Sequence, residues 1–146
     1  MENFGSALAD TSRVIRRVFN ARARDIGVTR PQWQVLTLLH RHEGINQGGL
    51  AELLEVEPIT VCRMVDRLQE GDLVERRADP ADRRSWRLYL TPKAAELLGQ
   101  LKPIADGLFA EAFEGIDEVE IIAVMGTLER IRQNLARRPE LRVSNG

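Results

Sequence analysis

The sequence has little cysteine, no long hydrophobic run and no excess of one charge sign, and each absence narrows the kinds of protein it can encode. The single cysteine among 146 residues, Cys62, cannot form an internal disulfide and suits a reducing compartment. No apolar run reaches the roughly 18 residues needed to cross a bilayer, so we expect no membrane partner. The segment 1–6 does not resemble a secretory signal. We therefore expect a cytoplasmic protein.

Motifs for catalysis and metal binding are also lacking. There is no nucleophile elbow, no glycine-rich phosphate loop and no spaced cluster of histidine, cysteine and acidic residues. His40 and His42 are two residues apart in a predicted helix and point to different faces, so they make a poor metal pair. We expect neither an enzyme nor a protein with a resident metal or cofactor.

The charge of the chain is balanced overall but uneven along the sequence. Lys and Arg number 21 against 22 Asp and Glu, for a formal charge of −1. Between Arg76 and Arg87, however, five arginines face only two acids. Phosphate binding depends on the local field rather than on net charge, so this segment is a candidate contact for nucleic acid.

The segment from 73 to 92 combines that basic charge with a hairpin pattern. Short alternating apolar runs at 73–74 and 86–90 flank a loop with turn-forming residues, which predicts a β-hairpin with a basic tip. The loop contains Asp79, Pro80, Asp82, Arg83 and Arg84. A helix precedes it over 58–70, and we expect Gly71 to end that helix in a left-handed conformation. A helix followed by a basic hairpin is the outline of a winged helix-turn-helix. The alternative is a surface hairpin whose arginines are only solvated.

Helical periodicity covers most of the remaining chain. Apolar residues recur at steps of three and four in the segments 4–26, 29–44, 46–54, 58–70, 92–113 and 117–136. Capping residues mark several starts: Thr29 with Gln32 as a capping box, Asn46, and Asp117 with Glu120. The polar tail 137–146 is expected to fray. The fold class is therefore mostly α with a small β-hairpin wing, a winged helix-turn-helix core flanked by long helices.

Two of these helices form a helix-turn-helix unit, and the terminal ones predict a dimer. Helices 46–54 and 58–70 are joined by a turn of three residues. In the second of them Val61, Val65 and Leu68 form the buried row, which leaves the other faces available to DNA. The small core can cover only part of the apolar stripes of the first and last helices, so we expect a homodimer. A compact monomer is the alternative.

The order of elements and several spaced motifs together resemble the MarR family of transcriptional regulators. The resemblance covers nearly the whole chain and rests on V-x-x-M-V-D-R-L at 61–68, G-D-L-V-E-R-R at 71–77, D-P-A-D-R-R-S at 79–85 and L-Y-L-T-P-K-A at 88–94. It implies an N-terminal dimerisation helix over 1–28 and a DNA-binding core over 29–92, with its recognition helix at about 58–70 and its wing at about 73–91. It also implies C-terminal dimerisation helices over 93–136.

The same resemblance assigns residues to double-stranded DNA. In the recognition helix it implies that Pro58, Ile59, Thr60, Cys62 and Arg63 meet bases and phosphates. In the wing, it places Arg84 in the minor groove, Asp82 as the residue that orients the loop, and Arg83 on a phosphate. Arg67 is either a DNA contact or a structural partner for Asp66, Glu70 or the wing. Two acids in the turn before the recognition helix, Glu57 and Glu55, are unfavourable for DNA binding, because carboxylates repel phosphate.

Relatives that respond to small aromatic acids or phenolic compounds suggest a ligand here as well. The resemblance implies a crevice in which Trp33 supplies an aromatic wall and Arg13 or Arg17 an anion partner, although plain core packing is the alternative for Trp33. Cys62 is interpreted as a small half-buried residue rather than an oxidation sensor. The expected function is a sequence-specific, homodimeric repressor of a pseudo-palindromic operator that a small ligand releases. A DNA-independent module that dimerises with another regulator is the alternative.

Overall fold

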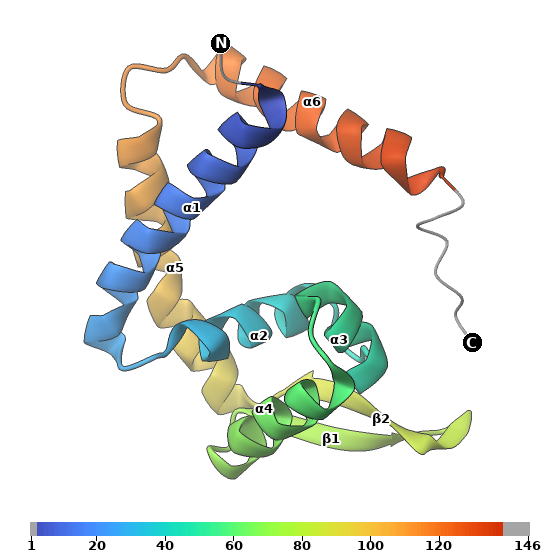
Figure 1. The fold of residues 1–146 in the computed structure, drawn as a ribbon. Coiled ribbons are helices and arrows are strands. Elements are labelled where there is room, and N and C mark those ends of the chain that lie inside the picture. Colours follow the sequence, from blue (N-terminus) through green and yellow to red (C-terminus); the bar gives the residue numbers. More distant parts are fainter. Residues whose placement is uncertain (1–2, 139–146) are drawn as a thin grey trace. The chain divides into compact units, whose positions relative to one another are not determined.

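The computed structural model describes residues 3–138, and its elements confirm the predicted fold class of helices with one β-hairpin (Figure 1). In chain order they are α1 (Phe4–Ala23), the 3-10 helix η1 (Arg24–Ile26), α2 (Arg30–Arg41), α3 (Gln47–Leu54), α4 (Pro58–Glu70), β1 (Val74–Asp79), β2 (Asp82–Leu90), α5 (Pro92–Ala112) and α6 (Glu118–Ala136). The predicted fraying of 137–146 falls, from residue 139 on, outside the described residues.

The chain divides into two compact units, 1–108 and 109–146. The first contains α1 to α4, the hairpin and most of α5, and it has the hydrophobic core. The second contains the end of α5 and α6, and no described residue of α6 is buried. The first unit therefore positions the candidate site.

The core of the first unit lies where α2, α3 and α4 meet the hairpin. Leu36, Leu50, Val65 and Leu88, one from each of these elements, are fully buried. Burying a side chain of this size stabilises the folded state by about 1.5–3 kcal/mol before entropy is counted. The predicted row of Val61, Val65 and Leu68 is confirmed as the buried face of α4.

The helix starts follow the predicted caps with one exception. Thr29 and Gln32 form the expected capping box at α2, and the Asn46 side chain accepts a hydrogen bond from the Gly49 amide at α3. Asp117 does occupy the N-cap of α6, but its side chain makes no capping hydrogen bond, so the predicted pair with Glu120 is wrong in that respect.

The end of α4 also differs from the prediction. Gly71 has φ −79°, and Asp72 instead takes the left-handed conformation with φ 58°. The Leu73 amide then donates to the Leu68 carbonyl at 2.8 Å, which closes the helix end. Aspartate tolerates this backbone better than most residues do, so the left-handed position moved one residue along the chain.

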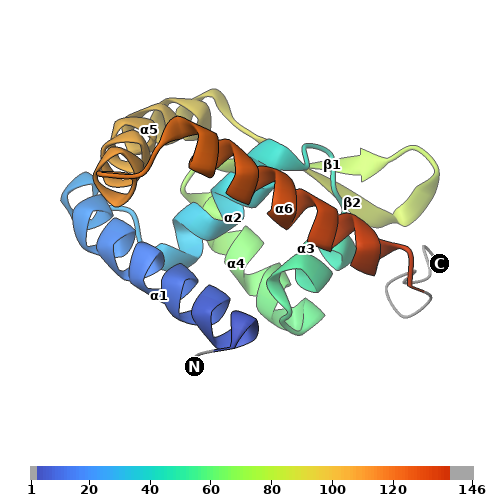
Figure 2. The same ribbon diagram turned by 90° about the horizontal axis from the view of Figure 1, so that it is seen from above.

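The hairpin extends the first unit beyond its helices. The strands pair antiparallel, from Val74 opposite Leu90 to Asp79 opposite Asp82. The Gly44 amide donates to the Leu88 carbonyl and the Leu88 amide donates to the Ile45 carbonyl, both at 2.9 Å, which fixes β2 to the chain before α3. In both views the tip of the hairpin projects past α3 and α4 (Figures 1 and 2).

Candidate nucleic-acid interface

The tip of the wing is a short turn followed by a bulge. The register changes from Ala78 opposite Trp86 to Asp79 opposite Asp82, so residues 83–85 of β2 have no partners in β1. The loop expected from the sequence is thus wrong in extent, because β1 and β2 continue to Asp79 and from Asp82. The extra residues bend the strand outward, as bulges do, and they include Arg83 and Arg84.

Two aspartates hold this tip in shape. Asp79 Oδ1 accepts a hydrogen bond from the Ala81 amide at 2.9 Å, and its Oδ2 lies 3.4 Å from Arg87 Nε. The Ala81 amide first, and then Arg87, lower the pKa of the Asp79 carboxyl. Asp82 Oδ1 accepts a hydrogen bond from the Arg84 amide at 3.0 Å. Both carboxylates therefore bind backbone of the turn that carries the arginines.

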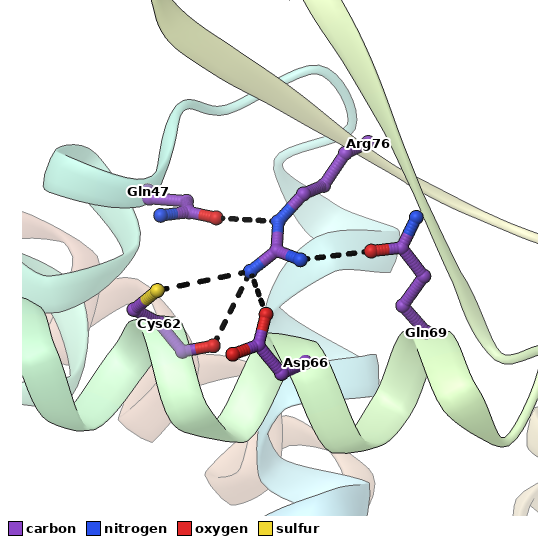
Figure 3. A network of polar contacts seen from close by, with 5 residues as sticks. All are labelled: Gln47, Cys62, Asp66, Gln69 and Arg76. Atoms are coloured by element: carbon purple, nitrogen blue, oxygen red, sulfur yellow. Dashed lines mark hydrogen bonds and ion pairs between the residues drawn. The ribbon is translucent and has the colours of Figure 1, made fainter.

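Arg76 joins the wing to the helix-turn-helix, a role that the sequence analysis did not assign to it. Its Nε donates to Gln47 Oε1 and its Nη1 to Gln69 Oε1, both at 2.8 Å (Figure 3). Its Nη2 lies 2.7 Å from Asp66 Oδ1 and donates to the Cys62 carbonyl at 3.2 Å. The Arg76 side chain is only 15% exposed, so it is a fixed link and not a free basic group.

A signal for this link exists in the sequence. Arg76 occupies the inward-facing register of β1, between Val74 and Ala78, where an apolar residue is usual. On α4 its partners Cys62, Asp66 and Gln69 follow one another at steps of four and three, on one helical face. An arginine at an inward-facing strand position, together with a row of polar residues on one face of the preceding helix, could have predicted this link.

The arginines around the interface fall into two groups. Arg76, Arg77 and Arg87 are paired with Asp66, Glu75 and Asp79, respectively. Four exposed arginines make no side-chain hydrogen bond or ion pair with any described residue: Arg63 and Arg67 on α4, and Arg83 and Arg84 on the wing. The structural partners suggested for Arg67 are accordingly absent, and Asp66 is held by Arg76 instead.

The remaining residues assigned to DNA lie at the start of α4. Pro58 is at the first turn, Ile59 is 60% exposed and Thr60 is exposed. Cys62 is half-buried, and its Sγ lies 4.0 Å from Arg76 Nη2, toward the wing. Glu57 occupies the N-cap without a side-chain capping bond. The structure therefore groups Ile59, Thr60 and Arg63 on exposed surface and sets Cys62 apart from them.

The residues assigned to a ligand lie near a surface pocket between α1 and α2. The pocket has a volume of about 240 Å³ and is lined by Arg13, Arg16, Arg17, Asn20 and Arg30. Trp33 is not among its lining residues. Its indole Nε1 donates to Asn20 Oδ1 at 3.0 Å, and its ring packs edge-on against Phe19. Trp33 thus supports Asn20 from behind and does not form the wall of the pocket.

Residues 3–138 contain no cluster of three or more histidine, cysteine or acidic residues suited to a metal. The same part of the chain has no helix that is long and apolar enough to span a membrane. The candidate functional site is therefore the basic surface formed by the exposed arginines of α4 and the wing.

A helix-turn-helix followed by an arginine-bearing hairpin defines a winged helix-turn-helix. Comparisons with known proteins agree with this class. A sequence model of the MarR family matches residues 28–86. The crystal structure of the transcriptional regulator PA3341 is 37% identical, with a TM-score of 0.80 over 93% of this chain and 100% of that one. A MarR transcriptional regulator from Methanosarcina mazei Go1 is 28% identical, with a TM-score of 0.77 over 89% of this chain and 94% of that one.

The chain therefore belongs to the MarR family, whose members are transcriptional regulators and not enzymes. The fold is shared also with a mutant MarR from E. coli complexed with operator DNA, at 23% identity and a TM-score of 0.72. That likeness covers 87% of this chain and 91% of the other.

Proposed function

We propose that this MarR-family protein is a homodimeric repressor that binds a pseudo-palindromic DNA operator and is released by a small anionic aromatic ligand. The observation that carries the proposal is the division of its arginines. Those that brace the fold are paired with acids, whereas Arg63, Arg67, Arg83 and Arg84 are exposed without a partner among the described residues. Exposed arginine is suited to phosphate oxygens and guanine edges.

The positions of these four arginines fit the two grooves of a duplex. Arg63 and Arg67 are on a helix, the element that the major groove admits. Arg83 and Arg84 are in the bulge at the wing tip, which can reach an adjacent, narrower groove. Arg76 connects the helix and the wing, so the two contacts keep a fixed separation. The operator complex of the E. coli MarR mutant supports the same use of this fold.

Exposed apolar surface supports the homodimer. Within the first unit, α1 exposes Phe4, Leu8 and Val14. Within the second, α6 exposes Val119 and Ile122, among others, and buries no residue. Apolar side chains exposed in this number are often covered by a partner. Two copies would present two recognition helices to half-sites about one DNA turn apart.

The arginine-lined pocket supports release by an anion. Its lining residues carry positive charge only, apart from the neutral Asn20, and Asp10 nearby is paired with Arg13 at 2.9 Å. A carboxylate could bind several of these guanidinium groups at once. The ligand would act by favouring a dimer geometry in which the half-site spacing no longer fits one turn.

Selection from a random pool of DNA duplexes tests the DNA-binding part. The proposal predicts enrichment of a pseudo-palindrome whose half-sites have centres about one helical turn, roughly 34–36 Å, apart. Absence of any enriched sequence contradicts it and favours a protein-interaction module that acts without DNA.

Benzoate and phenol, added to the complex with the selected duplex, test release by a ligand. We expect benzoate to weaken binding more than phenol, because the pocket offers guanidinium groups to a carboxylate. Arg17→Ala should reduce the response. If neither compound changes the affinity for DNA, this part of the proposal is wrong.

A further inference from the structure

Trp86 is a large apolar residue that the hydrophobic core does not use. It lies in β2 next to the bulge, and it is 48% exposed. Its partner across the ladder is Ala78, whose small side chain cannot cover an indole. Its Nε1 makes no hydrogen bond to any residue that the structure describes. A half-exposed tryptophan, with an apolar ring and an N–H donor at one edge, is a residue type that is enriched at contact surfaces.

The strand register gives the direction in which Trp86 points. Side chains alternate along a strand, and residues directly opposite each other share a face. Trp86 therefore shares a face with Leu88, which is fully buried, and with Arg76, which reaches α3 and α4. On this face Trp86 lies farther toward the wing tip than either, next to the bulge.

This place on the wing would lie near a particular part of a bound duplex. If α4 lies in the major groove and the bulge in the neighbouring minor groove, the sugar–phosphate strand separating the grooves must pass between them. We propose that Trp86 binds this strand, packing its ring on deoxyribose and donating its indole N–H to a phosphate oxygen. Nearby charge permits the contact, because the Asp79 carboxylate is engaged by the Ala81 amide and by Arg87. The inference rests on the proposed function.

Because sugars and phosphates are the same in every sequence, this contact contributes affinity and not specificity. It would also fix how deeply the wing enters its groove, since Trp86 is the first paired residue after the unpaired segment 83–85, which contains Arg83 and Arg84. Trp86 is thus the third point of attachment, between the helix and the tip.

Two readouts test the contact in the full-length protein. Anisotropy of a labelled duplex, selected by the wild type from a random pool, should show affinity about tenfold weaker for Trp86→Ala, a change equivalent to about 1.4 kcal/mol. An unrelated duplex of equal length should show a similar loss. Trp86→Phe keeps an aromatic ring but not the N–H donor, so its affinity for DNA should fall between those of the wild type and Trp86→Ala.

Intrinsic fluorescence gives the second readout, because Trp33 is the other tryptophan of the chain. DNA should change the emission of the wild type, and Trp86→Phe should abolish most of that change. Wild-type-like affinity in Trp86→Ala overturns the contact. Weaker binding by the variant also overturns it if DNA leaves the emission of the wild type unaltered, or if the variant has a lower melting temperature or a changed oligomeric state. If the wild type binds no DNA at all, the proposed function fails and this inference fails with it. If the wild type binds DNA and Trp86→Ala binds equally well, only this inference fails, so the two failures are distinguishable.

Discussion

Arg76 Nη2 and Asp66 Oδ1 lie 2.7 Å apart and join the wing to the recognition helix. The two residues are ten positions apart in the sequence, and the segment between them includes the end of α4 and the left-handed Asp72. Because the same guanidinium also reaches Gln47, one side chain holds three elements together. The proposed binding of DNA by both α4 and the wing would require these elements to keep their spacing.

Replacing Arg76 should therefore affect both stability and DNA binding. Arg76→Ala removes hydrogen bonds to a charged group and leaves Gln47, Gln69 and Asp66 without a partner. We expect the free energy of unfolding to fall by about 2 kcal/mol, measured by chemical denaturation.

Arg77→Ala is the matched control, since it removes the same charge from the next residue of the same strand. Arg77 is exposed, its ion pair with Glu75 is a surface pair and its guanidinium lies over the Tyr89 ring, so its replacement should lower the free energy of unfolding by clearly less than Arg76→Ala does. Equal losses in the two variants contradict the role given to Arg76.

Replacing Glu57, in the acidic turn before α4, should increase both stability and DNA affinity. Glu57 occupies the N-cap but makes no capping hydrogen bond. Glu57→Ser supplies a cap, worth about 1 kcal/mol, and loses a favourable interaction of a few tenths with the helix dipole. It also removes a negative charge beside the proposed phosphate contacts. Both unfolding free energy and DNA affinity should rise.

Glu55→Gln separates these two effects. It removes the same charge two positions earlier in the turn, at a position with φ 55° that caps the end of α3 and not the start of α4. DNA affinity should rise without the added stability. Unchanged affinity in both variants indicates that this turn does not approach phosphate.

The wing tip should depend on pH through Asp79. The pKa of this carboxyl is lowered from 3.8, first by the hydrogen bond from the Ala81 amide and then by Arg87. Since the folded-state pKa is the lower one, its stabilising effect is complete above the unfolded value and is lost as pH falls through the folded value. An NMR titration of the Asp79 carboxyl carbon should give a midpoint below 3.8.

Arg87→Ala should raise that midpoint only in part, because the bond from the Ala81 amide remains. A midpoint at or above 3.8 in the wild type is the contrary result.

A charge on α6 should disrupt the proposed dimer. Ile122 is 64% exposed in the single chain, so Ile122→Asp costs little if the protein is a monomer. In a dimer that buries this residue, the variant would have to bury an unpaired carboxylate, which is unfavourable enough to make the dimer dissociate. Sedimentation velocity should show a dimer for the wild type and mainly monomer for the variant. Asn134→Asp, at a polar exposed position of the same helix, should remain dimeric.

Periodicity and capping chemistry were sufficient to predict most of the fold. The row of Val61, Val65 and Leu68, the capping box at Thr29 and the hairpin itself follow from local patterns. The left-handed residue was misplaced at Gly71, because the backbone closes α4 through the Leu73 amide, which requires Asp72 in that conformation.

The candidate site was harder to predict from the sequence than the fold, because it depends on which charged side chains are already paired. Arg76 and Arg84 look alike in a basic segment, yet one is held by Asp66 and two glutamines and the other is free of described side-chain partners. Pairing across 7 to 29 residues of chain is a tertiary property. The position of Trp33 behind Asn20 was hidden for the same reason.

The central claim, that the unpaired arginines of α4 and the wing bind duplex DNA, is tested most directly by anisotropy at several salt concentrations. The labelled fragment would come from the region upstream of the gene, with wild type, Arg84→Ala and the paired control Arg77→Ala compared. The account predicts tight binding with a steep salt dependence, weaker binding with a shallower slope for Arg84→Ala, and little change for Arg77→Ala. Wild-type binding that is absent, or equal affinity in wild type and Arg84→Ala, would contradict it.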